Sequence, residues 1–435
     1  MGDLLWKKSG NAGPDRAVME FLAGEDIVLD RELLLFDIQA SAAHANGLCS
    51  IGILDDDENS LIQEALAVLA GEYRNGKRTL DAEFEDGHSA IETWLIEKLG
   101  PLGAKIHTGR SRNDQVAVAV RLYLKDQLAT LSELCGNIAE VLLARAGQDQ
   151  HIAVPGHTHL QKAMPSSAGL WLAGHAEAFI DNTEFSLQVA ACLDASPLGT
   201  AAGFGVNLPL AREAAAAEMG FARLVVNPQY AQNSRGKVEL LALSALASAT
   251  LDLRRLSWDF SLFTTAEFGY VRLPDRYCTG SSIMPNKNNP DVVELLRAVH
   301  AVVVGAQAEL NAVLSLPSGY HRDLQATKPP IIRAFGKGLQ ALALVPGLVQ
   351  DFSWDEARLR AAITPEMFAT DRATELAAQG TPFREAYRQV AESLAELEEN
   401  DVQKSLSERV SPGACARLGL DILQSRLDAL KFNRS

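Results

Sequence analysis

The chain has 435 residues, a length that suggests about three domains and allows a large buried core. Its composition, 47% hydrophobic and 22% charged, is typical of a soluble globular protein, and the net charge of −15 disfavours nucleic acid as a partner. The five cysteines lie far apart, so the sequence offers neither a zinc-type spacing nor a redox pair. No run of about 18 apolar residues predicts a membrane span, and the opening segment MGDLLWKKSG lacks the apolar stretch of a signal peptide. We therefore expect a cytoplasmic protein.

Long proline-free windows rich in alanine and leucine predict long helices, because proline breaks helix interiors. These windows lie at 102–154, 166–196, 229–273 and 291–316. Strand signals are weak, and the valine-rich stretch at 224–226 is short and isolated. We predict an all-α protein with three parts: an N-terminal helical domain at 1–104, a central long-helix bundle at 105–350 and a small helical domain at 351–435.

The window at 229–273 carries the clearest helical pattern. Apolar residues alternate there at steps of four and three, which is the spacing of a helix packed in a bundle. The stripe consists of Ala242, Leu246, Ala249, Leu253, Leu256, Phe260 and Phe263. A single helix through the whole window would be roughly 60 Å long, and one or two kinks would divide it into shorter pieces.

A further helix is predicted after Pro290. Asn289 suits the N-cap, Pro290 the first helical position and Asp291 the positive helix end. The apolar face predicted for this helix comprises Val292, Leu295, Leu296, Val299 and Val303.

Four polar segments interrupt the helical windows, and each could hold a carboxylate or move a proton. The segment at 108–115 places Arg110 and Arg112 before a helix start, where guanidinium and amide donors can grip a carboxylate, although a solvated helix cap explains it as well. The segment at 155–161 holds His157 and His159. A metal site would need further ligands at matching spacing, so acid–base use is the better interpretation.

The segment at 280–290 combines glycine, two serines and a proline, which is typical of a mobile loop over a site. Lys287 and Asn289 stand beside the positive start of the next helix, so together they could stabilise a negative charge such as a serine alkoxide. The segment at 320–328 places Tyr320 and Lys328 near one helical face. A fifth cluster, at 85–90, sets carboxylates next to His88; a helix start with a capping acid is an equally good interpretation of it.

These segments resemble one known family. GSSIMPNKNNP at 280–290 resembles the signature loop of the fumarase/aspartase superfamily. Within it, GRSRNDQ at 109–115 and HTHLQ at 157–161 are similar to the argininosuccinate lyases in particular, as are EDGHSAIE at 85–92, LPSGYHRDLQATK at 316–328 and TPFREAY at 381–387. The resemblance implies three mainly helical domains, a homotetramer with a twenty-helix core, and active sites built from segments of three subunits.

The resemblance also implies the reaction and the roles of residues. The reaction is β-elimination of argininosuccinate to arginine and fumarate through an aci-carboxylate intermediate, without metal or organic cofactor. Ser281 and His159 are the expected base and acid, with their assignment open, and Lys287 and Asn289 stabilise the intermediate. The residues expected to hold the substrate are Asn113, Thr158, Tyr320, Gln325 and Lys328, with Arg112, His88 and Asp86 as further contributors.

The chain departs from the family pattern near its beginning. Lys7, Lys8 and Ser9 replace the usual LWGGRF continuation, and Gly24 stands near the place of a substrate-binding serine. Both changes fall where the amino-acid end of the substrate would lie. Two alternatives therefore stay open: a lyase of the same superfamily acting on an acylated or other succinyl substrate, and an inactive structural homologue of the crystallin kind. Adenylosuccinate lyase and fumarase are disfavoured by GRSRNDQ, and inactivity by the complete set of acid, base and charge-stabilising residues.

Overall fold

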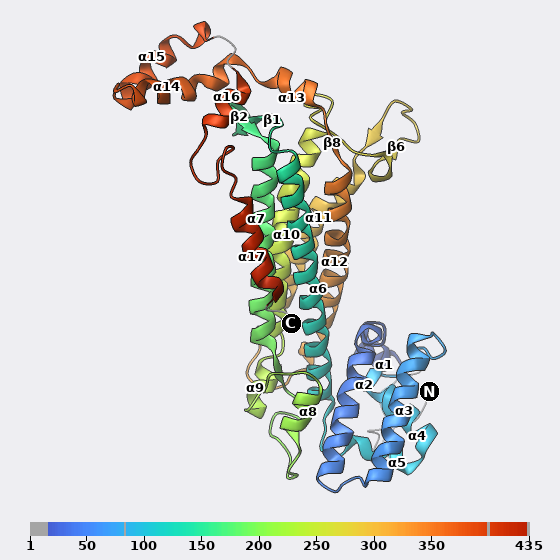
Figure 1. Ribbon diagram of the computed structural model, residues 1–435. Coiled ribbons are helices and arrows are strands. Elements are labelled where there is room, and N and C mark those ends of the chain that lie inside the picture. Colours follow the sequence, from blue (N-terminus) through green and yellow to red (C-terminus); the bar gives the residue numbers. More distant parts are fainter. Residues whose placement is uncertain (1–15, 82–83, 398–400, 433–435) are drawn as a thin grey trace. The chain divides into compact units, whose positions relative to one another are not determined.

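The computed structural model describes residues 16–81, 84–397 and 401–432, and these are mainly helical (Figure 1). The altered positions Lys7, Lys8 and Ser9 lie outside the described residues. Internal contacts divide the chain into two compact units. Unit 1 comprises Met1–Thr130, Ser186–Leu246 and Val302–Gly336, and unit 2 comprises Leu131–Phe185, Ala247–Ala301 and Lys337–Ser435.

Helices form most of the chain. The N-terminal helices are α1 (Arg16–Ala23), α2 (Asp26–Ser50), α3 (Asp56–Arg74), α4 (Gly87–Leu99) and α5 (Pro101–Ala104), followed by η1 (Lys105–His107). The long helices are α6 (Arg112–Gln148), α7 (Ala168–Leu193), α10 (Lys237–Phe263), α11 (Asp291–Val313) and α12 (Lys328–Asp351). Shorter helices are α8 (Arg212–Glu218), α9 (Pro228–Asn233), η2 (Asp275–Tyr277) and η3 (Arg322–Thr327). The C-terminal part contains α13 (Glu356–Ala362), η4 (Pro365–Phe368), α14 (Ala369–Ala378), α15 (Phe383–Glu392), η5 (Leu394–Glu396), α16 (Val402–Glu408) and α17 (Leu420–Phe432).

In the described part of the chain, the strands form four separate pairs. β1 (Ala153–Thr158) and β2 (Gln161–Ser167) make an antiparallel hairpin with a bulge between Pro155 and His157. The other pairs are two residues long: β3 (Ala195–Ser196) parallel to β4 (Arg223–Leu224), and, antiparallel, β5 (Val271–Arg272) with β8 (Ser353–Trp354) and β6 (Thr279–Gly280) with β7 (Asn288–Asn289). Pairs this short serve to fix loops, and the predicted all-α class is confirmed.

In unit 1, helices α2, α3 and α4 pack around a common apolar core that includes Leu34, Ile62 and Ile91. Two capping boxes fix where these helices begin. Asp55 caps α3 with Glu58 in return, and Asp86 caps α4 with Ser89 in return. Each box satisfies backbone N–H groups that a helix start leaves unpaired, so the sequence places these starts locally.

The predicted long helix at 229–273 is divided. α9 ends at Asn233 and α10 begins at Lys237, and Gly236 between them has φ +77°. A Cβ at this glycine would lie 2.1 Å from Leu314 Cδ2, so both the backbone and the packing require glycine. The stripe from Ala242 to Phe260 is buried, as the heptad spacing predicts.

The helix predicted after Pro290 is observed with two corrections. It begins at Asp291, one residue later than predicted, because Asn289 belongs to the β6–β7 pair. Leu295 is 69% exposed, and the buried face instead runs through Val293, Leu296, Val303, Ala306 and Leu310.

The parts of helices α6, α7, α10, α11 and α12 that belong to unit 2 lie side by side (Figure 1). An aromatic cluster joins their ends: Trp171 makes edge contacts with Phe260 and Trp354, and the Arg145 guanidinium lies 4.4 Å from the centroid of Phe352. Arg145 also donates hydrogen bonds to the carbonyls of Val349 and Phe352, and so supplies partners for backbone carbonyl groups at the end of α12.

One segment, Arg322–Asp351, is long and apolar enough to cross a membrane by length and composition alone. Core helices of globular proteins pass the same test, and Ile331, Ala334 and Phe335 of this segment are fully buried. Among the residues that the structure describes, no three histidine, cysteine or acidic side chains gather as a metal site would need.

Candidate active site

A charged pocket of about 510 Å³, open to solvent, lies in unit 1. Its walls come from five stretches of chain: the α1–α2 turn, the residues before α4, the start of α6, the α9–α10 connection and the segment at 320–328. It is lined by Leu22, Asp26, Glu85, Asp86, Arg112, Asn113, Val116, Arg235, Tyr320, Arg322, Gln325 and Lys328. Six of these are predicted substrate-binding residues: Asp86, Arg112, Asn113, Tyr320, Gln325 and Lys328. The structure therefore brings together segments that lie far apart in the sequence.

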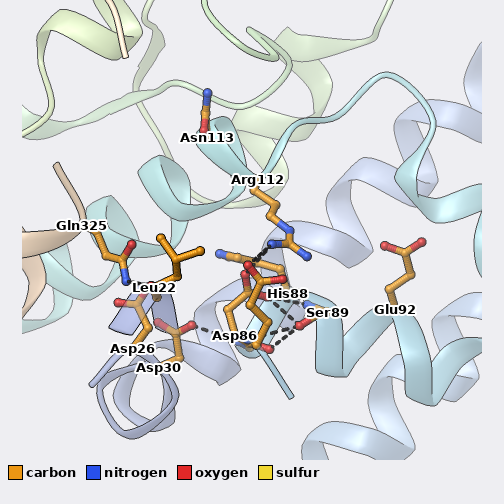
Figure 2. A network of polar contacts seen from close by, with 12 residues as sticks. Leu22, Asp26, Asp30, Asp86, His88, Ser89, Glu92, Arg112, Asn113 and Gln325 are labelled. Atoms are coloured by element: carbon orange, nitrogen blue, oxygen red, sulfur yellow. Dashed lines mark hydrogen bonds and ion pairs between the residues drawn. The ribbon is translucent and has the colours of Figure 1, made fainter. Parts of the chain in front are cut away.

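Asp86 and Glu85 hold the guanidinium of Arg112 at one wall of the pocket (Figure 2). The Arg112 Nη1 atom lies 3.0 Å from a Glu85 carboxylate oxygen and 3.3 Å from an Asp86 oxygen. Asp86 also accepts hydrogen bonds from the backbone N–H and the hydroxyl of Ser89, both at 2.8 Å. Burial acts to raise the pKa of Asp86, but His88, Arg112 and the Ser89 donors hold that pKa below its usual value. Asp86 is therefore a fixed carboxylate that orients Arg112.

His88 does not line the pocket. Its ring is buried in the first turn of α4, and Nδ1 lies 2.5 Å from Asp37 Oδ2. Burial acts to lower the pKa of His88, yet the nearby carboxylates of Asp37, Asp86 and Asp30 raise it above the usual value. His88 therefore pairs with Asp37 in the interior, close to the charge of Asp86.

Another part of the pocket wall holds Lys328 between two carboxylates. Its Nζ atom lies 2.8 Å from Asp26 Oδ1 and 2.8 Å from Asp30 Oδ1, and Asp30 Oδ2 also accepts from Gly87 N at 2.9 Å. Burial acts to lower the pKa of Lys328, but the two carboxylates raise it, so the ammonium stays charged. Next to it, Gln325 Nε2 and Arg322 Nη2 each donate to the Leu22 carbonyl at 3.0 Å.

Asp114 anchors the segment that carries Arg112 and Asn113. Its carboxylate accepts from Ser111 N at 2.9 Å, from Gly199 N at 3.0 Å and from Ala201 N at 2.8 Å. Burial raises the pKa of Asp114 to about 6, although these N–H donors oppose the shift. This anchor ties the start of α6 to the loop after β3, and no local sequence pattern indicates that contact.

His44 supports the same segment from α2. Its Nε2 lies 2.9 Å from the Thr108 carbonyl oxygen. Burial and the nearby Arg110 lower the pKa of His44 to about 3, so the ring is neutral near pH 7 and Nε2–H donates to the carbonyl.

The tip of the β1–β2 hairpin carries Thr158 and His159 in unit 2. His159 (φ +55°) and Leu160 (φ +58°) form a two-residue turn, and both side chains are exposed. Left-handed backbone is costly for a branched residue such as Leu160, so the turn stores strain. The two histidines are clearly different, because His157 packs against Phe268 and Tyr270 and its Nδ1–H donates to the Pro155 carbonyl.

The loop at 281–287 lies between β6 and β7, also in unit 2. Ser281 Oγ accepts hydrogen bonds from Met284 N at 3.0 Å and Ile283 N at 3.4 Å. Two backbone donors on one hydroxyl oxygen favour negative charge there. Lys287 is exposed and Asn289 half-buried, at the end of the same loop.

The predicted site residues therefore form two groups. One group forms the charged pocket of unit 1, and the other, with Thr158, His159, Ser281, Lys287 and Asn289, occupies two loops of unit 2. Sequence reasoning missed Asp26, Asp30 and Asp37. It also gave no role to Asp114, Arg322 and Glu85, although these residues stand within the quoted motifs, and that place was the available signal.

Comparison with solved structures supports the fold. The chain is similar to EDDS lyase in complex with formate, with a TM-score of 0.81 and 22% identity, covering 96% of this chain and 91% of that one. It is also similar to class II fumarase from Schistosoma mansoni, with a TM-score of 0.69 and 16% identity, covering 88% and 94%. At these identities the likeness shows the fold alone.

Sequence comparison shows the family. The profile of the lyase family matches residues 17–305, so the chain belongs to the lyase family. The chain is also 55% identical to the argininosuccinate lyase of Stenotrophomonas maltophilia over 431 residues, covering 99% of this chain and 100% of that one. Within the lyase family it is therefore a member of the argininosuccinate lyases, and the predicted family membership is confirmed.

Proposed function

We propose that the chain catalyses the reversible β-elimination of argininosuccinate to L-arginine and fumarate, in arginine biosynthesis in the cytoplasm. The observation that carries the proposal is the full-length 55% identity to an argininosuccinate lyase, combined with a pocket lined by Asn113, Tyr320, Gln325 and Lys328. The pocket offers both carboxylates and cations, which suits a zwitterionic substrate with several carboxylates.

The chemistry requires a base, an acid and a means of stabilising charge. Ser281 takes the proton from the carbon next to the carboxylate, and the electron pair left behind is delocalised into that carboxylate. The pair then forms the double bond as the carbon–nitrogen bond breaks, and His159 protonates the departing guanidino nitrogen. The two N–H donors on Ser281 Oγ support its use as the base, because they stabilise an alkoxide. The reverse assignment of base and acid remains the competing proposal.

Other residues take supporting roles. Lys287 and Asn289 stabilise the doubly charged intermediate. Asn113, Thr158, Tyr320, Gln325, Lys328, Arg112 and Asp86 bind the substrate, and His88 stabilises the charge of Asp86 from the interior. No metal or organic cofactor has a part in these steps.

We further propose that the enzyme is a homotetramer and that each active site combines segments of different subunits. The membership among the argininosuccinate lyases supports this assembly, because the resemblance implies active sites built from segments of three subunits. We also propose that each subunit has three domains, at 1–104, 105–350 and 351–435.

The test is the release of fumarate from argininosuccinate by the purified protein, followed by ultraviolet absorbance. Steady release that depends on enzyme concentration is expected. A folded tetramer that releases no fumarate would contradict the proposal and favour an inactive structural homologue or a different succinyl substrate.

A further inference from the structure

Charge is balanced on one wall of the unit 1 pocket. Glu85 and Asp86 face two guanidinium groups, Arg112 at 3.0 and 3.3 Å and Arg322 at 3.9 Å from Glu85. Two carboxylates against two cations leave this wall neutral. A substrate cation therefore gains little net attraction from it.

Charge is not balanced on the part of the wall around Lys328. A single ammonium group, Lys328 Nζ, serves both Asp26 and Asp30 at 2.8 Å each, which leaves a net charge of −1. The Asp30 side chain is almost fully buried, with its second oxygen taken by Gly87 N, and it does not line the pocket. Asp26, which Figure 2 shows beside Asp30, does line the pocket, so the surplus negative charge is open to a ligand at Asp26.

The surroundings of Asp26 make the surplus negative charge energetically unfavourable when no ligand is bound. Burial raises the pKa of Asp26, as do the nearby carboxylates of Asp30 and Asp86, while Lys328 opposes the rise. A ligand cation that approaches Asp26 would remove this cost and replace lost water contacts with charge-assisted hydrogen bonds. The best match is a compact ammonium group.

We propose that Asp26 is a specificity-determining residue that binds the free α-ammonium group of the arginine end of the substrate and rejects substrates acylated at that nitrogen. The inference rests on the proposed function. Acylation replaces an ammonium by a neutral amide with a single N–H, adds bulk, and leaves Asp26 and Asp30 to share the one ammonium group of Lys328. A binding site strongly rejects a ligand that leaves the site's buried polar groups short of partners.

The first measurement uses the wild-type enzyme with argininosuccinate and with its Nα-acetyl derivative. We expect kcat/KM to be lower by on the order of 10²-fold or more for the acetylated substrate. Arginine should likewise inhibit at far lower concentration than Nα-acetylarginine. Equal kcat/KM values, or faster release from the acetylated substrate, would overturn the inference while leaving the lyase activity intact. Fumarate release from neither substrate would instead overturn the proposed function and, with it, this inference.

The second measurement compares Asp26→Asn with Asp30→Asn. Each variant removes one of the two carboxylate charges that pair with Lys328, but only Asp26→Asn alters a side chain that lines the pocket. We expect the preference for the free over the acetylated substrate to collapse in Asp26→Asn and to fall much less in Asp30→Asn. If Asp26 served only to hold Lys328, both substrates would slow equally and the preference would not change. The wild-type measurements keep the inference falsifiable if either variant fails to fold.

Discussion

Ser281 is held by its own loop. The hydroxyl oxygen accepts two backbone N–H groups, while its neighbour Ser282 is exposed and has no predicted catalytic role. This geometry is local, so the loop can be studied by single substitutions without disturbing a core.

We predict that Ser281→Ala lowers kcat by a factor on the order of 10²–10⁴, because the base is lost, with little change in the melting temperature. Steady-state kinetics and thermal unfolding check this. Ser282→Ala is the matched control and should slow the enzyme far less. Near-wild-type turnover by Ser281→Ala would remove this residue from the mechanism, and His159→Asn would then be the variant expected to abolish turnover.

Two buried histidines of unit 1 have opposite charge states. The pKa of His88 is raised from 6.5 in the fold, so its stabilising contribution is complete below pH 6.5 and is lost as pH rises through the folded pKa. The pKa of His44 is lowered to about 3, so its contribution is complete above pH 6.5 and falls as pH decreases toward 3.

We predict opposite pH dependences for the two corresponding variants. The decrease in melting temperature caused by His88→Gln should be greatest near pH 6 and smaller at higher pH, because the ion pair with Asp37 needs a protonated ring. The decrease caused by His44→Gln should be greatest above pH 6.5 and smaller in acid. Thermal unfolding of both variants and the wild type across this range is the measurement, and parallel trends would contradict the assigned charge states.

At the scale of elements, glycine decides where one long helix stops. Gly236 separates α9 from α10 with φ +77°, and a Cβ there would meet Leu314 at 2.1 Å. We predict that Gly236→Ala destabilises the fold by about 2–4 kcal/mol, from backbone strain together with overpacking. The melting temperature should fall by several degrees.

A matched control for this glycine is Gly71→Ala within α3. Gly71 has helical backbone, and a Cβ added there would meet no atom within 4 Å, so alanine should be neutral or slightly stabilising. Similar melting temperatures for the two variants would show that the break between α9 and α10 does not depend on glycine.

At the scale of the whole molecule, the two groups of site residues bear on assembly. If each active site draws Asn113 from one subunit and Ser281 from another, a hybrid tetramer contains some sites free of both substitutions. We predict that Asn113→Ala and Ser281→Ala proteins, each inactive alone, regain measurable activity after they are denatured and refolded together. Refolding each variant alone is the control.

Measurement of mass in solution accompanies that experiment. A tetramer with regained activity is the expected result. An active monomer, or a tetramer whose hybrids stay inactive, would contradict shared active sites.

The elements and the family could be predicted from the sequence alone. Proline spacing and the heptad stripe predicted α6, α7, α10 and α11, because proline disfavours helix interiors and a packed helix buries every third or fourth residue. The same rule missed α12, which contains Pro346 in its interior. The capping acids Asp55 and Asp86 act within one turn. Short motifs, each a contiguous stretch of sequence, carried the family resemblance that the comparisons confirmed.

Which side chains meet, and which charges are balanced, depended on the folded chain. Lys328 pairs with Asp30 across 298 positions of sequence, and no local pattern marks that contact. Burial separated His157, packed on aromatic rings, from the exposed His159, and moved His88 from the predicted substrate contacts to a place behind the pocket wall. The physical reason is that pairing and desolvation depend on neighbours brought in by folding, whereas helix periodicity and capping depend on residues a turn away.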